Sequence, residues 1–381
     1  MKISKKLLLP VALIASGIFI KAGEINAFAF PLPSEEILSG YELTVSAMGK
    51  NYTFSYPEID ISGGRAYLKN CREVVEGIYY DTVKKPVDAE VKIYPEREDP
   101  FVFSNEKDGV GIDRERLIRD IDAALYKRAA KLKAKEVVLK PTETVENLKK
   151  STYRLTSFST SYHSSTEERK RNIALAAKYI GGVRLNGGEE FSFNGVVGER
   201  SEKRGFSGAK IILNGKFIEG IGGGVCQVSS TLYNAAVLAG LTVTERHSHS
   251  LAVGYVEPSF DAMVNSGSSD LKFVNTGEKP VYIVVNATGE KITARIYGEK
   301  SDYTYRRVSV VEEYIEAPES EIVETDEMPT GESRVSVYPK RGLKSTGYID
   351  VYKNGKFLRR KKLSADTYSP MRGITLVGKG A

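Results

Sequence analysis

Cysteine and histidine are both scarce in this sequence of 381 residues, which holds two cysteines and three histidines. The cysteines, Cys71 and Cys226, lie far apart, and Cys71 has an ordinary Lys-Asn-Cys-Arg context. These numbers exclude a small fold held together by several disulfides, although they leave open a single bond between the two thiols. A site that needs a thiol and an imidazole must therefore lie where these few residues come together.

A long apolar run is also missing, because a membrane-spanning helix needs about 20 apolar residues. The strongly apolar stretch at residues 7–20 is only 14 residues long, follows a basic start, and precedes Ala27-Phe28-Ala29, which fits a cleavage site. This order predicts a signal peptide over residues 1–29 and an exported protein that is secreted or associated with the cell envelope. An uncleaved signal anchor is the only membrane attachment that we expect.

Charge of one sign is not concentrated anywhere. The chain has 55 Lys and Arg against 49 Asp and Glu, a net charge of +6. No basic stripe with interleaved aromatic residues stands out, so nucleic acid is excluded as a partner. A modest positive balance suits an anionic surface such as a cell wall or lipid headgroups.

Hydrophobic periodicity and turn signals predict an α+β protein of several domains. Residues 30–150 read as an α+β domain, with a helix that Asp113 caps at its N-terminus. Residues 151–295 read as a central α+β domain in which a cysteine-bearing helix packs on antiparallel strands. Residues 300–381 read as an all-β module, and the acidic stretch at 312–327 resembles a linker.

The central domain contains a glycine-rich turn, Gly222-Gly223-Gly224, that leads to Cys226 at the start of an apolar helical stripe. A helix N-terminus favours a thiolate, because its free N–H groups and its dipole stabilise negative charge. The helical stripe stops at Gly240, and a strand-like run follows over residues 241–253. On one strand His247 and His249 would face the same side, since side chains repeat every second residue.

Several segments of the chain resemble the VanW family, above all the string Gly-Gly-Gly-Val-Cys-Gln-Val-Ser-Ser-Thr at 222–231. The resemblance also rests on residues 156–160, 172–173, 188–194, 245–250 and 270–273. The preceding domain resembles the peptidoglycan-binding domain often found before VanW domains, and the last 80 residues resemble a G5 domain. These resemblances imply a cell-envelope protein that binds or acts on peptidoglycan or another wall polymer, but they supply no reaction.

The layout is similar, more distantly, to transglutaminase-like and papain-like thiol enzymes, although the His-Ala-Trp pattern of transglutaminases is absent. That similarity implies Cys226 as nucleophile, His249 or His247 as base, and Asp261 or Asp270 as the orienting carboxylate. No cofactor is expected. The residues expected to bind a ligand are Gly222, Gly223, Gly224, Gln227 and Arg246.

Other interpretations of the same residues stay open. Cys226 can be a small buried packing residue, and the two histidines can be surface residues of a strand. One Cys and two His can also hold zinc with an open position, but no Cys-x-x-Cys or His-Glu-x-x-His accompanies them, so we rank metal below the thiol and predict none. Two functions follow: a cysteine-dependent hydrolase or transpeptidase-like enzyme, or a non-catalytic wall-binding scaffold.

Overall fold

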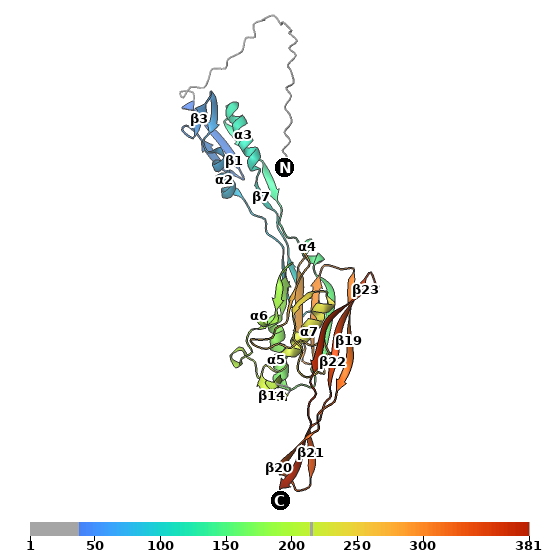
Figure 1. Cartoon of the computed structure of the whole chain (residues 1–381). Coiled ribbons are helices and arrows are strands. Elements are labelled where there is room, and N and C mark those ends of the chain that lie inside the picture. Colours follow the sequence, from blue (N-terminus) through green and yellow to red (C-terminus); the bar gives the residue numbers. More distant parts are fainter. Residues whose placement is uncertain (1–37, 214–215, 381) are drawn as a thin grey trace, which may run out of the picture. The chain divides into compact units, whose positions relative to one another are not determined.

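The computed structural model describes residues 38–213 and 216–380 (Figure 1). The predicted signal peptide and the predicted Asn214-Gly215 turn therefore lie outside the described residues. Within the described ranges, none of the helices combines the length and the apolar character needed to cross a membrane. Both cysteines are free thiols.

The chain divides into two compact units, which we describe separately. Among the described residues, the first comprises 38–85 and 110–138, and the second comprises 86–109, 139–213 and 216–380. In this division residues 86–109 and 139–150 group with the central region. The expected β-module of residues 300–381 belongs to that same second unit.

The first unit packs two helices on short antiparallel and parallel strands around one apolar core. Asp113 caps a helix as predicted, since its side chain accepts a hydrogen bond from the Arg116 N–H at 3.0 Å. The elements are β1 (Leu43–Ala47), β2 (Lys50–Phe54) and β8 (Lys131–Lys133) in one sheet, the pairs β3 (Ile59–Ser62) with β4 (Arg65–Leu68) and β7 (Gly109–Ile112) with β9 (Glu136–Leu139), and the helices α2 (Cys71–Thr82) and α3 (Arg114–Tyr126).

A four-stranded antiparallel sheet forms the centre of the second unit, in the order β10 (Tyr153–Ser161), β18 (Lys291–Gly298), β17 (Val281–Ala287) and β11 (Gly182–Leu185). One face of this sheet packs against α5 (Glu167–Ile180) and α7 (Val225–Leu238) in the main apolar core. The opposite face places Tyr282 and Tyr297 against Phe101.

Shorter elements surround this sheet. They are β5 (Glu90–Ile93), β6 (Phe101–Ser104), α4 (Val145–Lys150), β12 (Glu190–Ser192), α6 (Phe193–Val197), the 3-10 turn η1 (Glu202–Arg204), the hairpin β13 (Gly208–Leu213) and β14 (Lys216–Ile221), β15 (Thr242–Glu245) and β16 (Lys272–Val274). Strands β12, β16 and β15 form a second sheet in that order.

The last part of the second unit consists of two three-stranded sheets. The first joins β19 (Tyr303–Ile315), β22 (Gly342–Lys353) and β23 (Lys356–Tyr368), and the second joins β20 (Glu321–Pro329), β24 (Ile374–Gly380) and β21 (Ser333–Val337). The structure thus confirms the predicted mixture of α and β and the β-only C-terminal part.

Two sequence-based expectations about strands were wrong. The acidic stretch 312–327 is not a linker, because β19 runs to Ile315 and β20 begins at Glu321. Strand β20 is exposed along most of its length and pairs through its backbone with β24, so it shows no alternation of apolar and polar residues. The strand expected over 241–253 ends at Glu245, and side-chain contacts fix the chain beyond it.

Candidate functional site

Helix α7 begins at a tight glycine turn that places Cys226 in its first turn. Gly224 caps the helix with φ of 104°, a conformation that side chains rarely adopt. A Cβ on Gly223 would lie 2.7 Å from the Lys210 carbonyl oxygen, so only glycine fits there. The N–H of Cys226 belongs to the first turn, where backbone N–H groups have no acceptor within the helix. An anion at this position is therefore favoured by the helix dipole.

Polar side chains of α7 are buried, and each forms hydrogen bonds. The Ser230 hydroxyl donates to the Cys226 carbonyl at 2.7 Å and accepts from the Ala262 N–H at 2.9 Å. The Ser229 hydroxyl donates to the Ala262 carbonyl at 2.5 Å. The Asn234 amide donates to the Phe260 carbonyl at 2.7 Å. These bonds hold residues 260–264 beside the first turns of α7, so the loop carrying Asp261 is fixed next to Cys226.

Neither His247 nor His249 lies in a regular strand, and the two side chains have different surroundings. His247 forms one bridge with Met263, is 42% exposed at its side chain, and hydrogen-bonds to Glu245 at 3.1 Å. His249 is only 6% exposed, and its Nδ1 lies 2.6 Å from Asp261 Oδ2. The expectation that both histidines share one strand face was therefore wrong.

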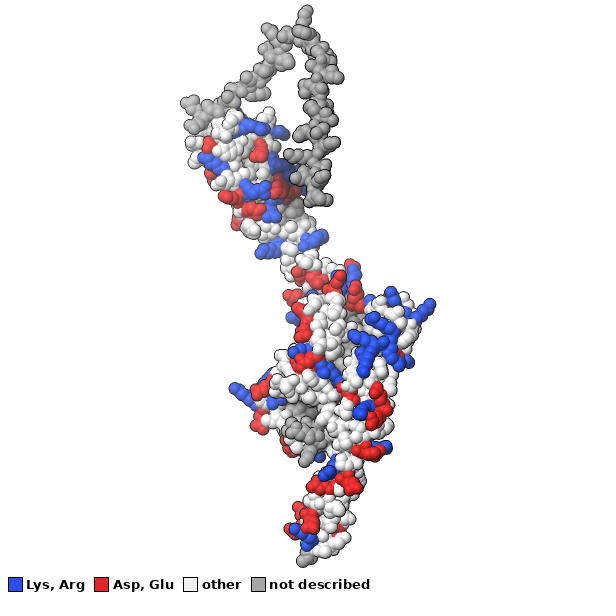
Figure 2. Space-filling view, in the orientation of Figure 1, with Lys and Arg blue, Asp and Glu red and all other residues white. Residues whose placement is uncertain are grey.

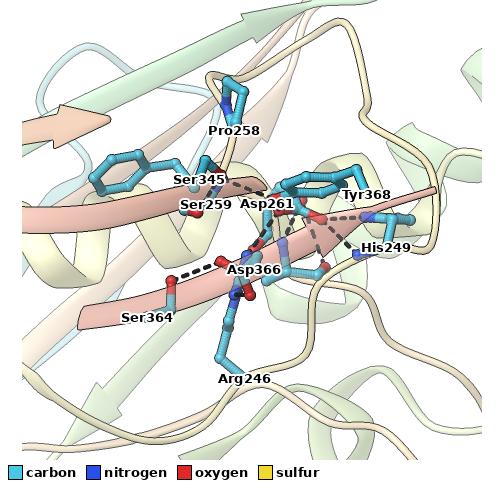
Figure 3. Close-up of polar contacts among 12 residues, drawn as sticks. Arg246, His249, Pro258, Ser259, Asp261, Ser345, Ser364, Asp366 and Tyr368 are labelled. Carbon is cyan, nitrogen blue, oxygen red and sulfur yellow. Dashed lines mark hydrogen bonds and ion pairs between the residues drawn. The ribbon is translucent and has the colours of Figure 1, made fainter. Parts of the chain in front are cut away.

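Asp261 is the most fully satisfied charged group of the site (Figure 3). Its Oδ2 accepts from the backbone N–H of His249 at 2.7 Å as well as from the ring. Its Oδ1 accepts from Arg246 Nη2 at 2.7 Å and from the Tyr368 hydroxyl at 2.6 Å. Burial would raise the pKa of Asp261, but these hydrogen bonds and the charges of Arg246 and His249 hold it below its ordinary value. The carboxylate is thus ionised and fixed.

Cys226 and His249 shift each other's pKa. Burial alone would raise the pKa of the Cys226 thiol, but its hydrogen bond with His249 and the His249 charge lower it below the ordinary value. Burial lowers the pKa of His249, yet the bonds to Asp261 and Cys226 outweigh that effect and raise it to about 9. Since Asp261 occupies Nδ1, the other ring nitrogen is left for the thiol. The Sγ also donates to the Val264 carbonyl at 3.3 Å.

Two arginines and a tyrosine contribute to the electrostatics around the thiol. Arg200 and Arg169 are partly buried, and burial lowers the pKa of each, while the negative charge of Cys226 opposes that shift. Burial raises the pKa of Tyr255 well above its ordinary value, and the Cys226 charge raises it further. Positive charge near Cys226 favours a thiolate.

The structure brings some of the predicted residues together and separates others. Gln227 is buried away from solvent, with its amide bonded to the Thr160 hydroxyl and the Ser161 carbonyl. Asp270, the alternative carboxylate, accepts from the Ser192 hydroxyl and the Asn194 N–H. Asp270 therefore supports the start of α6, whereas Asp261 contacts the histidine.

Arg246 was expected to bind a ligand, but its guanidinium is only 7% exposed and lies between two carboxylates. Its Nη1 lies 2.6 Å from Asp366 Oδ1, and its Nη2 pairs with Asp261. Asp366 and Tyr368 both belong to β23, in the C-terminal β region. Sequence reasoning missed these two residues because they lie more than 100 positions from Asp261 and carry no motif.

A metal site does not emerge from the geometry. Across residues 38–213 and 216–380, no group of three His, Cys, Asp or Glu residues is placed to hold a metal ion. His247 faces Glu245 rather than Cys226, so the Cys-His-His set considered for zinc is not assembled.

A cavity of about 920 Å³ lies beside the Arg246–Asp366 pair. Strand β15 and the C-terminal part of α7 form one wall, and β19, β22 and β23 form the other. Its lining includes Tyr303, Tyr305, Arg359 and Lys361.

Comparison with known proteins divides the second unit into two matched regions. Residues 168–297 match the family model described as VanW like protein, and residues 306–379 match the G5 domain model. The chain is 42% identical over 147 residues to the uncharacterized protein YoaR of Bacillus subtilis (strain 168), which covers 39% of this chain and 48% of YoaR. The peptidoglycan-binding role expected for residues 30–150 stays a prediction.

A second relative is the vancomycin B-type resistance protein VanW of Enterococcus faecalis (strain ATCC 700802 / V583). The identity is 28% over 149 residues, covering 38% of this chain and 54% of that protein. The chain thus spans about half the length of these curated relatives.

Two solved G5 domain structures are also similar. The IgA1 protease G5 domain shares 26% identity with a TM-score of 0.16, covering 22% of this chain and 95% of that domain. The HP0197-G5 structure shares 27% identity with a TM-score of 0.13, covering 20% of this chain and all of that structure.

Proposed function

We propose that this chain, which carries a VanW domain followed by a G5 domain, is a cell-wall-associated thiol acyltransferase that acts on peptide amides of peptidoglycan. The observation that carries the proposal is the Cys226–His249–Asp261 arrangement, with His249 Nδ1 2.6 Å from Asp261 Oδ2 and its thiol partner at a helix N-terminus. A nucleophile, a base and an orienting carboxylate in this order form the triad of thiol enzymes.

The reaction begins when the Cys226 thiolate attacks the amide carbonyl carbon and forms a C–S bond. The backbone N–H of Cys226 stabilises the oxyanion of the tetrahedral intermediate, since the N–H groups of Val225 and Gln227 already donate to the Gly222 and Gly224 carbonyls. His249 donates its proton to the leaving amine as the C–N bond breaks, which leaves an acyl-thioester and a neutral imidazole. The imidazole then accepts a proton from water or from an amine that attacks the thioester carbonyl carbon. The C–S bond breaks and Cys226 leaves as the thiolate beside protonated His249, which gives hydrolysis or transpeptidation.

A carboxylate-bearing peptide suits the surroundings of the thiol. Arg169 and Arg200 lie near enough for their charges to interact with Cys226, and both are partly buried. Guanidinium groups bind carboxylates through paired hydrogen bonds. Wall peptides carry free carboxylates, and the exported location proposed from the signal sequence makes them the available substrates.

The experiment that tests the function measures the rate of Cys226 alkylation by iodoacetamide between about pH 4 and about pH 9. We expect the thiol to react at a pH below the ordinary thiol pKa of about 8.5, because His249 stabilises the thiolate. The change His249→Ala is expected to shift this profile toward higher pH. His247→Ala provides the matched control, since His247 contacts Glu245 and should leave the profile unchanged.

Two results would contradict the enzyme proposal. A thiol that labels only after denaturation would make Cys226 a packing residue and the protein a wall-binding scaffold. Equal shifts for the two histidine variants would remove the special role of His249.

We propose that the wall partner is an anionic polymer that binds at the 920 Å³ cavity. Arg359 and Lys361 of β23 line it with Tyr303 and Tyr305, a combination of positive charge and aromatic rings that suits an anionic glycan. Figure 2 shows Lys and Arg gathered on the surface where β23 lies.

Replacing both Arg359 and Lys361 by Gln is expected to weaken binding to purified cell walls by about tenfold at low salt. Co-sedimentation of the protein with cell walls at increasing salt concentration measures the binding affinity, and the wild-type affinity should fall as salt rises. Lys362→Gln is the matched control, because side chains alternate along β23 and Lys362 lies on the face away from the cavity. Lys362 pairs with Tyr348, whereas Lys361 pairs with the cavity residue Ile349. A loss for Lys362→Gln as large as that of the double variant would contradict the cavity as the binding site.

A further inference from the structure

Strand β23 of the G5 domain contacts residues that surround the Cys226–His249 pair: its Tyr368 bonds to Asp261, and its Asp366 bonds to Arg246. We infer that the G5 domain is a working part of the thiol site, because Tyr368 positions Asp261 for His249. This inference rests on the proposed function of Cys226 and goes beyond it, since it assigns a catalytic support role to a domain otherwise regarded as a wall-binding module.

The carboxylate of Asp261 is held from two sides (Figure 3). The ring and the backbone N–H of His249 both donate to Asp261 Oδ2. The bonds to the other oxygen, Oδ1, therefore fix the rotation of the carboxylate. Tyr368 and Arg246 both donate to Oδ1, at 2.6 and 2.7 Å. Without a donor on Oδ1 the carboxylate can turn, and the imidazole then loses the orientation that brings its other nitrogen to Cys226.

Tyr368 is itself fixed, which makes it suited to position another group. It is buried, and its hydroxyl oxygen accepts from the Ser259 N–H at 2.7 Å while it donates to Asp261. The second G5 residue, Asp366, holds Arg246 from the opposite side at 2.6 Å, and the Ser364 hydroxyl donates to Asp366 at 2.7 Å. Both donors to Oδ1 therefore depend on β23: one belongs to it, and the other is held by it.

The test uses the full chain with the single change Tyr368→Phe, which removes only the hydroxyl. We expect alkylation of Cys226 near neutral pH to become about tenfold slower, as expected for losing one hydrogen bond to a charged group. The apparent thiol pKa should move toward its ordinary value. A lower melting temperature alone does not move the pH profile of the folded protein, so the profile separates positioning from simple stability.

Ser345→Ala is the matched control. The Ser345 hydroxyl, from β22, bonds the Ser259 hydroxyl at 2.7 Å, so this change removes a buried bond between the same two domains without touching Asp261. It should lower the melting temperature and leave the pH profile unchanged. A double-mutant cycle adds a second control, because Tyr368→Phe should have no further effect on reactivity once Asp261→Asn is present.

The pH profile of Tyr368→Phe decides whether Tyr368 positions Asp261. An unchanged profile in Tyr368→Phe, with an activated thiol in the wild type, would overturn the inference and leave the proposed function standing. An inert wild-type thiol would overturn both. Should Tyr368→Phe not fold, Asp366→Asn gives the same readout: a shifted profile supports the role of β23, and an unshifted one refutes it.

Discussion

Cys226→Ala is expected to abolish turnover of wall-peptide amides, with a rate loss of about 10⁴-fold or more, because no other group replaces a deleted nucleophile. The measurement is the release or exchange of amine from purified muropeptides, followed by mass spectrometry. The same assay on the wild type should trap an acyl group on Cys226 when the reaction is quenched with acid.

Cys71→Ala is the matched control, since Cys71 is the other of the two cysteines. Burial raises the pKa of the Cys71 thiol, and no histidine contributes to that shift. The Cys71 variant should keep wild-type turnover within about twofold. Retained turnover in Cys226→Ala would exclude Cys226 as the nucleophile.

Arg246→Met is expected to lower the free energy of unfolding by about 3–5 kcal/mol, because it leaves Asp261 and Asp366 buried without their shared cation. The two carboxylates are 1% and 7% exposed, so water cannot replace the lost charge. Urea unfolding at about pH 7 measures the effect.

The pH dependence of that loss has a defined sign. Asp261 has a depressed pKa in the folded protein, so it contributes stability above its unfolded pKa and loses it as the pH falls. The penalty of Arg246→Met should therefore be largest near neutral pH and shrink as the pH falls and Asp261 becomes protonated in the variant. A penalty independent of pH would indicate lost packing instead.

Arg306→Met serves as the comparison. Arg306 also pairs with a buried aspartate, Asp350, but its own side chain is 65% exposed and Arg360 pairs with the same carboxylate. The expected loss is about 0–1 kcal/mol.

Much of the fold could be predicted because it depends on local signals. The helix after Asp113, the hairpin of β13 and β14, and α7 behind its glycines all follow from caps, turns and periodicity within a few residues. Strand β20 could not be predicted in this way, since its exposed residues carry no alternation and its pairing partner, β24, lies about 50 residues later.

The candidate site shows the same division. Cys226, His249 and Asp261 were candidates from the sequence, since residue type and order point to thiol chemistry. The choice between the two histidines depended on where the chain leaves β15, because Glu245 ends the strand and the next residues turn inward. Tyr368 had no local signal at all, because its role exists only through contacts between distant segments.

The distance between Asp261 and Tyr368 along the chain has a consequence for how the protein matures. These residues are separated by 107 positions, and Arg246 and Asp366 by 120. Synthesis proceeds from the N-terminus, so Cys226, His249 and Asp261 all leave the ribosome well before β23. Until β23 has been synthesised, the Asp261 carboxylate lacks Tyr368 and Arg246 lacks Asp366. The hydrogen-bond network around Asp261 is therefore complete only after β23 has been synthesised and has docked.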